Sequence, residues 1–316
     1  MSSPSLGRRT ASGSTSFLGR SQPRYGEKAI KVLLVAASLV SVLTTIGIVI
    51  ALIPPAVTFF GKVDFGDFIA GTNWSPLFKP PSFGVIPLVT GTLMVTLIAL
   101  LVAVPLGLGA AVYLSEYSNA RVRNIFKPML EVLAGIPTVV YGFFALKAIT
   151  PLLQDIWPGG EGPQVFNALA AGFVMGIMII PTIASLAEDS MSAVPRALRD
   201  GAYGLGSSRM QVSTRVVVPA ALSGIVAAVV LGISRALGET MIVAIAAGGR
   251  PNLSFDPLEG MQTMTAFIAA AGIGDLPTGS VGYQTIFAVG SLLFVMTLVM
   301  NLLSIRLVRK YREVYE

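Results

Sequence analysis

Long stretches without a charged residue are the feature of this sequence that most restricts its fold. Four such runs cover residues 32–53, 88–114, 165–187 and 285–305. Each reaches the roughly 20 apolar residues that a helix needs to cross the hydrocarbon core of a bilayer. Only 12% of the 316 residues are charged, which is about half the share found in a soluble domain. We therefore expect a polytopic, all-α membrane protein.

Two further spans carry charged residues and bring the expected number of transmembrane helices to six. One covers roughly residues 129–150 and has Glu131 near its start. The other covers roughly residues 220–247 and contains Arg235 and Glu239. The first apolar run is too long for the apolar part of a signal peptide, and no Ala-x-Ala site follows it. It is therefore expected to persist as a span.

The distribution of positive charge predicts the orientation of these spans. Most of the 22 Lys and Arg residues lie in the N-terminal segment, the second and fourth connections and the C-terminal tail. These segments share one side of the membrane, and the positive-inside rule makes that side the cytoplasm. The expected location is a bacterial cell membrane, plasma or inner, with both termini cytoplasmic. Nucleic acid is not an expected partner, because the basic residues are dispersed without interleaved aromatic residues.

Composition along the chain predicts a tail, one span, an outer connection and a five-span core. Residues 1–28 are expected to be a disordered basic cytoplasmic tail, because they are rich in Ser, Gly and Arg. The other expected segments are a first transmembrane helix at 29–54, an extracytoplasmic connection at 55–87, the core at 88–310 and a cytoplasmic tail at 311–316. The connection is rich in aromatic residues, which fits either contact with the membrane surface or a docking surface.

Several kinds of chemistry are excluded by what the sequence lacks. It has no Cys and no His, so thiol catalysis, Ser-His-Asp triads and zinc sites of the usual kind are not expected. The only Gly-Lys pair, at Gly61, does not fit the Walker A pattern for binding nucleotide phosphates. We expect no catalytic residue, no metal site and no cofactor in this chain. Any ATP and Mg would be bound by a partner chain.

One spaced motif lies in the connection of about residues 188–219. It reads Asp200-Gly201-Ala202, three residues, Gly206, nine residues, and then Val-Val-Val-Pro219. Two short helices that meet at Gly206 can bend sharply, because glycine permits positive φ. Small residues at the first positions let a partner surface approach closely, and Pro219 can open the next helix at its first turn. An ordinary helical hairpin is the alternative interpretation.

This motif resembles the EAA loop of ABC-importer permeases. The pattern of that family is Glu-Ala-Ala, three residues, Gly, nine residues, and Ile-x-Leu-Pro, and Asp200 stands where the family has Glu. The resemblance implies a MetI-like permease core. It also implies that Asp200, Gly201, Ala202, Gly206 and Pro219 couple the chain to a separate ATPase.

Two stretches within the spans that carry charge indicate which class of ABC-importer permeases the chain resembles. One runs from Glu131 to Pro137-Thr138, and the other is Arg235-Ala-Leu-Gly-Glu239-Thr240. Together with the loop, they resemble phosphate ABC-importer permeases of the Pst system, PstC type, over roughly residues 84–310. The resemblance implies inorganic phosphate as substrate, a PstA-type permease subunit, a PstB-type ATPase dimer and a PstS-type phosphate-binding protein as partners. Membrane lipid surrounds such a subunit. The alternatives are a permease for another oxyanion, such as molybdate or sulfate, and an ion-driven secondary transporter.

The charged residues of the span 220–247 are candidates for the substrate path. Charge within a span is costly, so its presence indicates a function. Arg235 and Glu239 are four residues apart and would be neighbours on one helix face. On a continuous helix, Arg235 would lie about 24 Å beyond Pro219, well inside the bilayer. A guanidinium suits phosphate oxygens. Glu239 would hold the arginine in place or weaken its hold on phosphate. An ion pair that only fixes packing is the alternative.

The remaining path candidates surround these two residues. Pro137 is expected to kink or interrupt its helix. The predicted substrate path comprises Glu131, Pro137, Thr138, Arg235, Glu239 and Thr240. For Glu131, a packing or interfacial role remains open.

Overall fold

The computed structural model describes residues 25–159, 161–274 and 276–310. The chain separates into two compact units, residues 1–51 and 52–316. Both are helical, which confirms the expected all-α class. The described residues form only two short strands, β1 (Trp74–Ser75) and β2 (Ser82–Phe83), which pair antiparallel. Residues 1–24 and 311–316, where most of the two tails were expected, lie outside the described residues.

The first unit, as far as the structure describes it, consists of helix α1 (Tyr25–Phe60) up to the boundary with the second unit. The helix extends beyond both ends of the expected span 29–54. Residues 25–28, expected in the tail, form its first turn. Glu27 lies in that turn, where a negative charge favours a helix N-terminus. Pro54 and Pro55 lie inside the helix near the boundary between the units.

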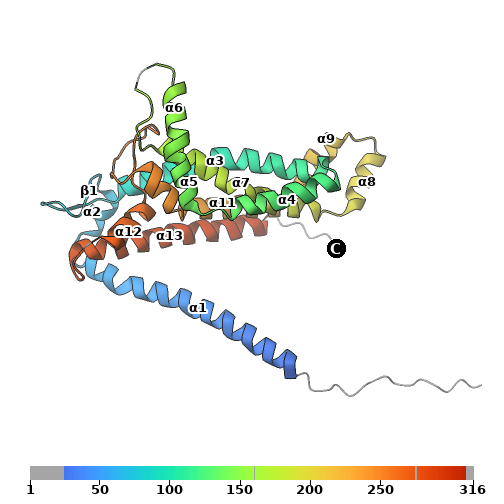
Figure 1. The fold of residues 1–316 in the computed structure, drawn as a ribbon. Helices are drawn as coiled ribbons and strands as arrows, with labels where there is room; N and C mark the ends of the chain where they lie inside the picture. The colour runs from blue at the N-terminus through green and yellow to red at the C-terminus, as the bar shows by residue number, and fades with distance from the viewer. Residues whose placement is uncertain (1–24, 160, 275, 311–316) are drawn as a thin grey trace, which may run out of the picture. The chain divides into compact units, whose positions relative to one another are not determined.

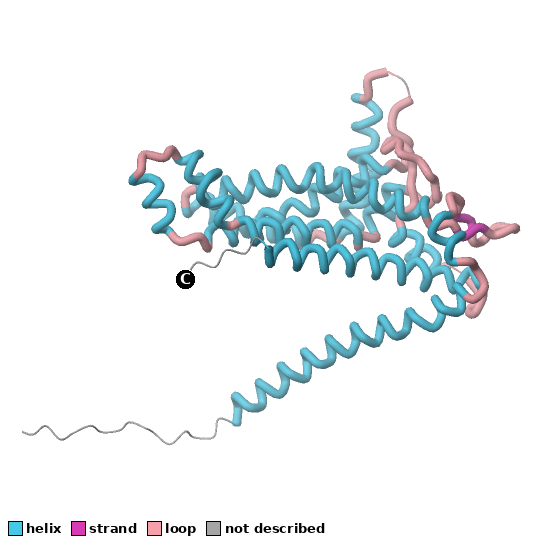
Figure 2. The backbone as a smooth tube through the Cα atoms, turned by 180° about the vertical axis from the view of Figure 1, so that it is seen from behind, coloured by secondary structure: helices cyan, strands magenta, loops and turns pink. Residues whose placement is uncertain are grey.

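The second unit is a helical bundle with its loops gathered at the ends, as Figures 1 and 2 show. The α-helices in chain order are α2 (Phe65–Ala70), α3 (Ile86–Val112), α4 (Ala120–Ala134), α5 (Thr138–Phe144), α6 (Thr150–Ile156), α7 (Ala168–Ser192), α8 (Arg196–Gly204), α9 (Arg209–Val212), α10 (Val218–Ala220), α11 (Leu222–Leu237), α12 (Met264–Ile273) and α13 (Val281–Lys310). Four π-helical turns adjoin them: η1 (Tyr113–Tyr117), η2 (Ala145–Ile149), η3 (Ser213–Val217) and η4 (Val243–Ala247).

Side-chain caps fix where several of these helices begin. The Asn119 side chain accepts the N–H of Val122 at 2.9 Å at the start of α4. Asn167 accepts the N–H of Ala170 at 2.7 Å at the start of α7, and Thr263 accepts that of Ala266 at 3.2 Å at the start of α12. Such caps satisfy backbone donors that have no partner within the helix.

The structure has enough long apolar helices to cross a membrane five or six times. Among the described residues, five helices qualify by themselves, and a bent pair made of 209–220 and 222–237 gives a sixth. The runs 88–114, 165–187 and 285–305 correspond to α3, α7 and α13. The two expected spans that carry charge differ from the prediction, and both differences arise from breaks in the helix.

The third span begins later than residue 129. Helix α4 ends at Ala134, and α5 begins at Thr138 after a break that contains Gly135 and Pro137. Proline lacks the N–H that a continuous helix needs, which explains the break. The long apolar helix of this region therefore covers residues 138–156. Helix α4 is separate and amphipathic, and none of its residues is fully buried.

The fifth span is broken twice, so the expected continuous helix over 220–247 is wrong. Its first part bends by 73° where α10 meets α11 at Ala221. Helix α11 then ends at Leu237 with Gly238 as its C-cap, and helix resumes at residues 241–247. The straight distance expected between Pro219 and Arg235 does not apply to this bent path.

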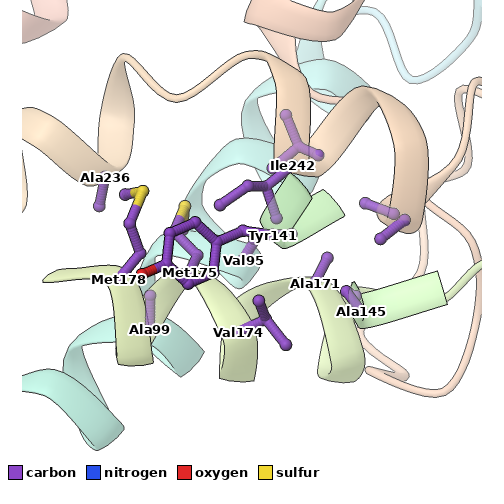
Figure 3. Close-up of a cluster of buried hydrophobic side chains, with 14 of the residues drawn as sticks. Val95, Ala99, Tyr141, Ala145, Ala171, Val174, Met175, Met178, Ala236 and Ile242 are labelled. Atoms are coloured by element: carbon purple, nitrogen blue, oxygen red, sulfur yellow. The ribbon is translucent and has the colours of Figure 1, made fainter. Parts of the chain in front are cut away.

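Helices α3 and α7 make the most extensive contact of the bundle. A Cβ added to Gly172 of α7 would lie 2.7 Å from Ile98, and one added to Gly176 would lie 2.8 Å from the carbonyl oxygen of Ala99. Small residues let membrane helices approach to this degree. Figure 3 shows Tyr141 of α5 beside Met175 and Met178 of α7 in the adjoining core.

Several aromatic residues of the connection 55–87 belong to a buried cluster that they share with α3, α12 and α13. Phe59, Phe68 and Trp74 are almost fully buried. The Trp74 ring meets Phe267 of α12 edge to face, with 4.9 Å between ring centroids. Phe78, by contrast, is 75% exposed. Local packing therefore accounts for the buried aromatic residues without a membrane surface or a docked partner.

Candidate functional site

The first candidate site is the loop that joins α7 to α11, residues 193–221, here named the α7–α11 loop. Gly206 has φ +82°, the only positive φ in this loop, as its sequence spacing predicted. The N–H groups of Gly206 and Ser207 bond to the carbonyl oxygens of Tyr203 and Ala202 at 2.9 and 3.1 Å. This pattern is a Schellman motif, which ends α8 sharply. Ser208 and Gln211 then form a capping box that starts α9.

The turn between α8 and α9 presents an exposed apolar tip. Leu205 is 89% exposed and Met210 is 68% exposed. Asp200 and Gly201 of α8 are exposed as well, and a Cβ at Gly201 would meet no atom within 4 Å. Ala202 is half-buried and packs toward the bundle. The sequence motif thus lies on a protruding, accessible knob.

Pro219 lies at the far end of this loop. It lies in α10, the last three residues of the helical run 209–220, directly after the π-helical turn η3, and not in the first turn of α11. The sharp change of direction follows two residues later at Ala221, so the proline precedes the bend between α10 and α11.

Arg199 of α8 fastens the loop to the end of α3. Its guanidinium donates to the Glu116 carboxylate of η1, from Nη2 to Oε1 at 2.8 Å and from Nε to Oε1 at 3.2 Å. Nη1 also donates to the carbonyl oxygen of Val194 at 2.6 Å, and Nη2 to that of Met191 at 2.8 Å. The Glu116 side chain is only 5% exposed. A planar fork with several donors suits this buried, bidentate arrangement.

A second contact joins the loop to the same turn. The Arg209 guanidinium lies over the Tyr117 ring, 5.1 Å from its centroid. Beneath these contacts, Ala111 of α3, Val212 of α9 and Val217 of η3 belong to one buried apolar cluster. Both halves of the loop therefore contact the end of α3.

An ion cluster ties α4 to the same end of α7. The Glu188 carboxylate, whose side chain is 1% exposed, pairs with Arg123 and with Lys127, the latter at 2.8 Å. Lys127 also pairs with Asp189. Burial acts to lower the pKa of Lys127, but hydrogen bonds to Asp189 and Glu188 and their negative charges outweigh it and raise the pKa above 10.5. Charge-assisted bonds of this kind keep the lysine protonated.

The second candidate site is the break between α11 and η4. Glu239 lies in this break and is 9% exposed. Its carboxylate accepts the N–H groups of Met241 and Ile242 at 3.0 and 3.3 Å, so it caps the helix that follows. The hydroxyl of Thr265 in α12 donates to the Glu239 carbonyl oxygen at 2.7 Å. The carboxylate therefore satisfies donors of the helix that follows, and Thr265 satisfies the backbone acceptor of Glu239 within the break.

Arg235 stands apart from Glu239 in this arrangement. It lies in the last turn of α11 and is exposed, whereas Glu239 is beyond the helix end. Among the described residues, no ion pair joins the two side chains. The predicted placement of Arg235 and Glu239 side by side on one helix face is therefore not observed. Thr240 is half-buried in the break.

The break between α4 and α5 carries the other predicted path residues. The Tyr141 hydroxyl donates to the Leu133 carbonyl oxygen across this break, at 2.8 Å. Pro137 caps α5 and is exposed, and Thr138 follows it half-buried. Glu131 is exposed on α4.

The two breaks belong to elements that pack against each other. A Cβ at Gly142 of α5 would lie 3.0 Å from Ile245 of η4 and 3.2 Å from the Met241 carbonyl oxygen. Broken helices in a membrane need protein or water to satisfy the freed backbone groups. Here the Tyr141 hydroxyl bonds one freed carbonyl oxygen, and the Glu239 carboxylate bonds two freed N–H groups. Neither break contains a metal-binding cluster, since the described residues hold no group of three His, Cys, Asp or Glu side chains suited to a metal.

Sequence reasoning did not identify Glu116, Arg199 or the ion cluster around Glu188. Glu116 and Arg199 are 83 residues apart in sequence. The only available signal was the placement of Glu116 and Glu188 at the ends of long uncharged runs, next to connections rich in arginine.

Comparison with known proteins places this geometry in a family. A model of the "Binding-protein-dependent transport system inner membrane component" family matches residues 103–313. The "Probable ABC transporter permease protein YqgH" of Bacillus subtilis is 36% identical over 248 residues, covering 78% of this chain and 79% of that protein. The "Phosphate transport system permease protein PstC" of Mesorhizobium japonicum is 34% identical over 249 residues, covering 73% and 74%. The PstC protein of Haemophilus influenzae is 34% identical over 267 residues, covering 78% and 82%.

Solved structures share the fold at lower sequence identity. A chain of a bacterial ABC transporter for alginate import matches with a TM-score of 0.60 and 16% identity, over 92% of this chain and all of that one. A chain of the MetNI methionine ABC transporter in an inward-facing conformation matches with a TM-score of 0.52 and 19% identity, over 73% and 95%. The expected MetI-like fold is thereby confirmed. The chain belongs to the family of binding-protein-dependent transport system inner membrane components, as a membrane-spanning permease subunit of an ABC transporter.

Proposed function

We propose that this chain is the permease subunit of an ATP-driven importer of inorganic phosphate. The observation that carries the proposal is the 33–36% identity to PstC phosphate permeases of several bacteria, over about three quarters of the chain. The family match over residues 103–313 includes the α7–α11 loop and both helix breaks. The ATPase activity belongs to a separate subunit, and this chain makes and breaks no covalent bond.

The proposed complex contains a PstA-type permease subunit, a PstB-type ATPase dimer and a PstS-type phosphate-binding protein. The exposed knob of α8 and α9 is the proposed seat of the ATPase, because it combines an apolar tip with small residues that permit close approach. The loop would then be cytoplasmic, with both termini on the same side. Excess Lys and Arg in these segments supports that orientation.

The proposed substrate path runs past the two helix breaks. Arg235 is exposed at the end of α11, beside the second break, and its guanidinium could contact phosphate oxygens transiently. Glu131, Pro137, Thr138, Glu239 and Thr240 remain proposed members of the path. Glu239 contributes by shaping the break, since its carboxylate is already bonded to the backbone.

Uptake of labelled phosphate into vesicles tests the proposal. The vesicles hold the complete complex, with binding protein outside and ATP inside, and the variants are Asp200→Arg and Arg235→Ala. We expect ATP-dependent uptake in the wild type and a loss of about tenfold or more in each assembled variant. Arg235→Lys should also impair uptake, because lysine lacks the planar fork of donors.

Competing anions and ion gradients separate the alternatives. Unlabelled phosphate should abolish uptake of the label, whereas a tenfold excess of molybdate or sulfate should leave it nearly unchanged. Uptake that follows a proton or sodium gradient without ATP would contradict the importer. Disassembly of the Arg235→Ala complex would assign that residue to packing.

A further inference from the structure

The end of α3 is bound to the α7–α11 loop by a side-chain network that the sequence motif does not contain. The loop is covalently continuous with α7 and α11. It does not adjoin α3 in sequence, because α3 ends at Val112 and η1 at Tyr117. Arg199 closes this gap with its bonds to Glu116, and Arg209 adds its contact with Tyr117.

The burial of this contact makes it costly to break when the loop moves. The Glu116 side chain is almost fully buried, and the Arg199 side chain is 16% exposed. Removing one partner would leave a buried charge unpaired, which costs far more than loss of an exposed pair. Arg199 also donates to the carbonyl oxygens of Met191, in the last turn of α7, and of Val194, just beyond it. One guanidinium on α8 therefore binds both the end of α7 and η1, the turn that follows α3.

We propose that Arg199 and Glu116 are positioning residues. When the ATPase moves the α7–α11 loop, this pair makes α3 move with the loop. The pair lets one movement of the loop reach α3 as well as α7 and α11. This inference rests on the proposed function, because it requires a separate ATPase that grips the loop. Loss of the pair should uncouple ATP hydrolysis from transport while the complex stays assembled.

The measurement is the amount of labelled phosphate imported per ATP hydrolysed, in proteoliposomes that hold the complete complex. The variants are Glu116→Gln, Arg199→Gln and the double variant. Arg121→Gln on α4 is the matched control, because it removes the same charge from an exposed arginine with no ion pair among the described residues. We expect the ratio to fall at least about fivefold in each single variant. The double variant should fall no further, because both changes break one interaction.

A covalent replacement gives a second readout. The chain has no native cysteine, so Glu116→Cys with Arg199→Cys introduces its only two thiols. We expect this variant to be uncoupled, to regain coupling with a short thiol-reactive cross-linker that a reductant can cleave, and to lose it again on reduction.

Each outcome bears on a different claim. An unchanged ratio of imported phosphate to hydrolysed ATP in the single variants would contradict the proposed role of Arg199 and Glu116. Disassembly of the Glu116→Gln complex would contradict it as well. A wild type that imports phosphate without ATP would instead overturn the proposed function. Additive losses in the double variant would show that the two residues act separately.

Discussion

Glu239 shows how a charged residue inside a membrane protein can serve the backbone beside it. A break in a spanning helix frees N–H groups that lipid cannot satisfy. The Glu239 carboxylate accepts two of them, from Met241 and Ile242. The acid is therefore accommodated at 9% exposure without an ion-pair partner among the described residues.

This role predicts that the acceptor oxygen of Glu239 matters more than its charge. Glu239→Gln keeps an acceptor of the same length, so its thermal unfolding in detergent should resemble that of the wild type. Glu239→Ala leaves the two N–H groups without a cap and should lower stability by about 1 kcal/mol. Equal destabilisation by both changes would contradict the capping role and restore a role for the charge.

At the scale of helices and loops, the sequence predicts what depends on neighbouring residues and misses what depends on distant ones. Uncharged runs predicted α3, α7 and α13, because every residue of such a run must be compatible with lipid. Hydropathy does not report whether a helix is continuous, so the end of α11 at Leu237 was missed. Gly206 was predictable, since positive φ is a local property of glycine.

The contacts that hold the candidate site together were out of reach for the same reason. Glu116 and Arg199 meet only because α3 and α7 pack side by side and end at the same level. Their pairing depends on three-dimensional proximity between segments 83 residues apart. Arg235 and Glu239, only four residues apart, were expected to meet and do not, because the helix between them ends.

The close packing of α3 and α7 predicts a sharp penalty for one added methyl group. Gly176→Ala places a Cβ 2.8 Å from the Ala99 carbonyl oxygen and should destabilise the protein by about 1–3 kcal/mol, since backbone cannot move aside easily. Gly109→Ala on α3 is the matched control, because a Cβ there meets nothing within 4 Å. Denaturation of the purified protein in detergent measures both. Equal stability of the two variants would show that the helices are not in this contact.

The ion cluster between α4 and α7 predicts a pH dependence. Burial alone would lower the pKa of Lys127. Its bonds to Asp189 and Glu188 outweigh burial, so folding raises the pKa above 10.5. Its contribution to stability is therefore fully present below pH 10.5 and is lost as the pH rises through the higher folded pKa. The difference in unfolding temperature between wild type and Lys127→Met should be constant near neutral pH and shrink above pH 10.5. Lys79→Met, at an exposed site, should show no such trend.

For the whole molecule, the proposed orientation places the α7–α11 loop and the connection 55–87 on opposite sides of the membrane. Single cysteines can be introduced cleanly, because the chain has none. A membrane-impermeant maleimide should label Phe78→Cys in intact cells, where the side chain is 75% exposed. It should label Leu205→Cys, at an 89% exposed position, only after the cells are opened. The reverse pattern would invert the topology and contradict the proposed ATPase seat.

The glycine contacts between α3 and α7 also have a mechanical consequence. Helices that touch at their backbones cannot separate easily at that level, so the contact can act as a pivot for a tilt that starts at their loop ends. The 25 residues of α7 extend about 37 Å, so a tilt of about 5° at one end displaces the other by about 3 Å. A small tilt that begins at the loop would thus be carried along α7 to its other end.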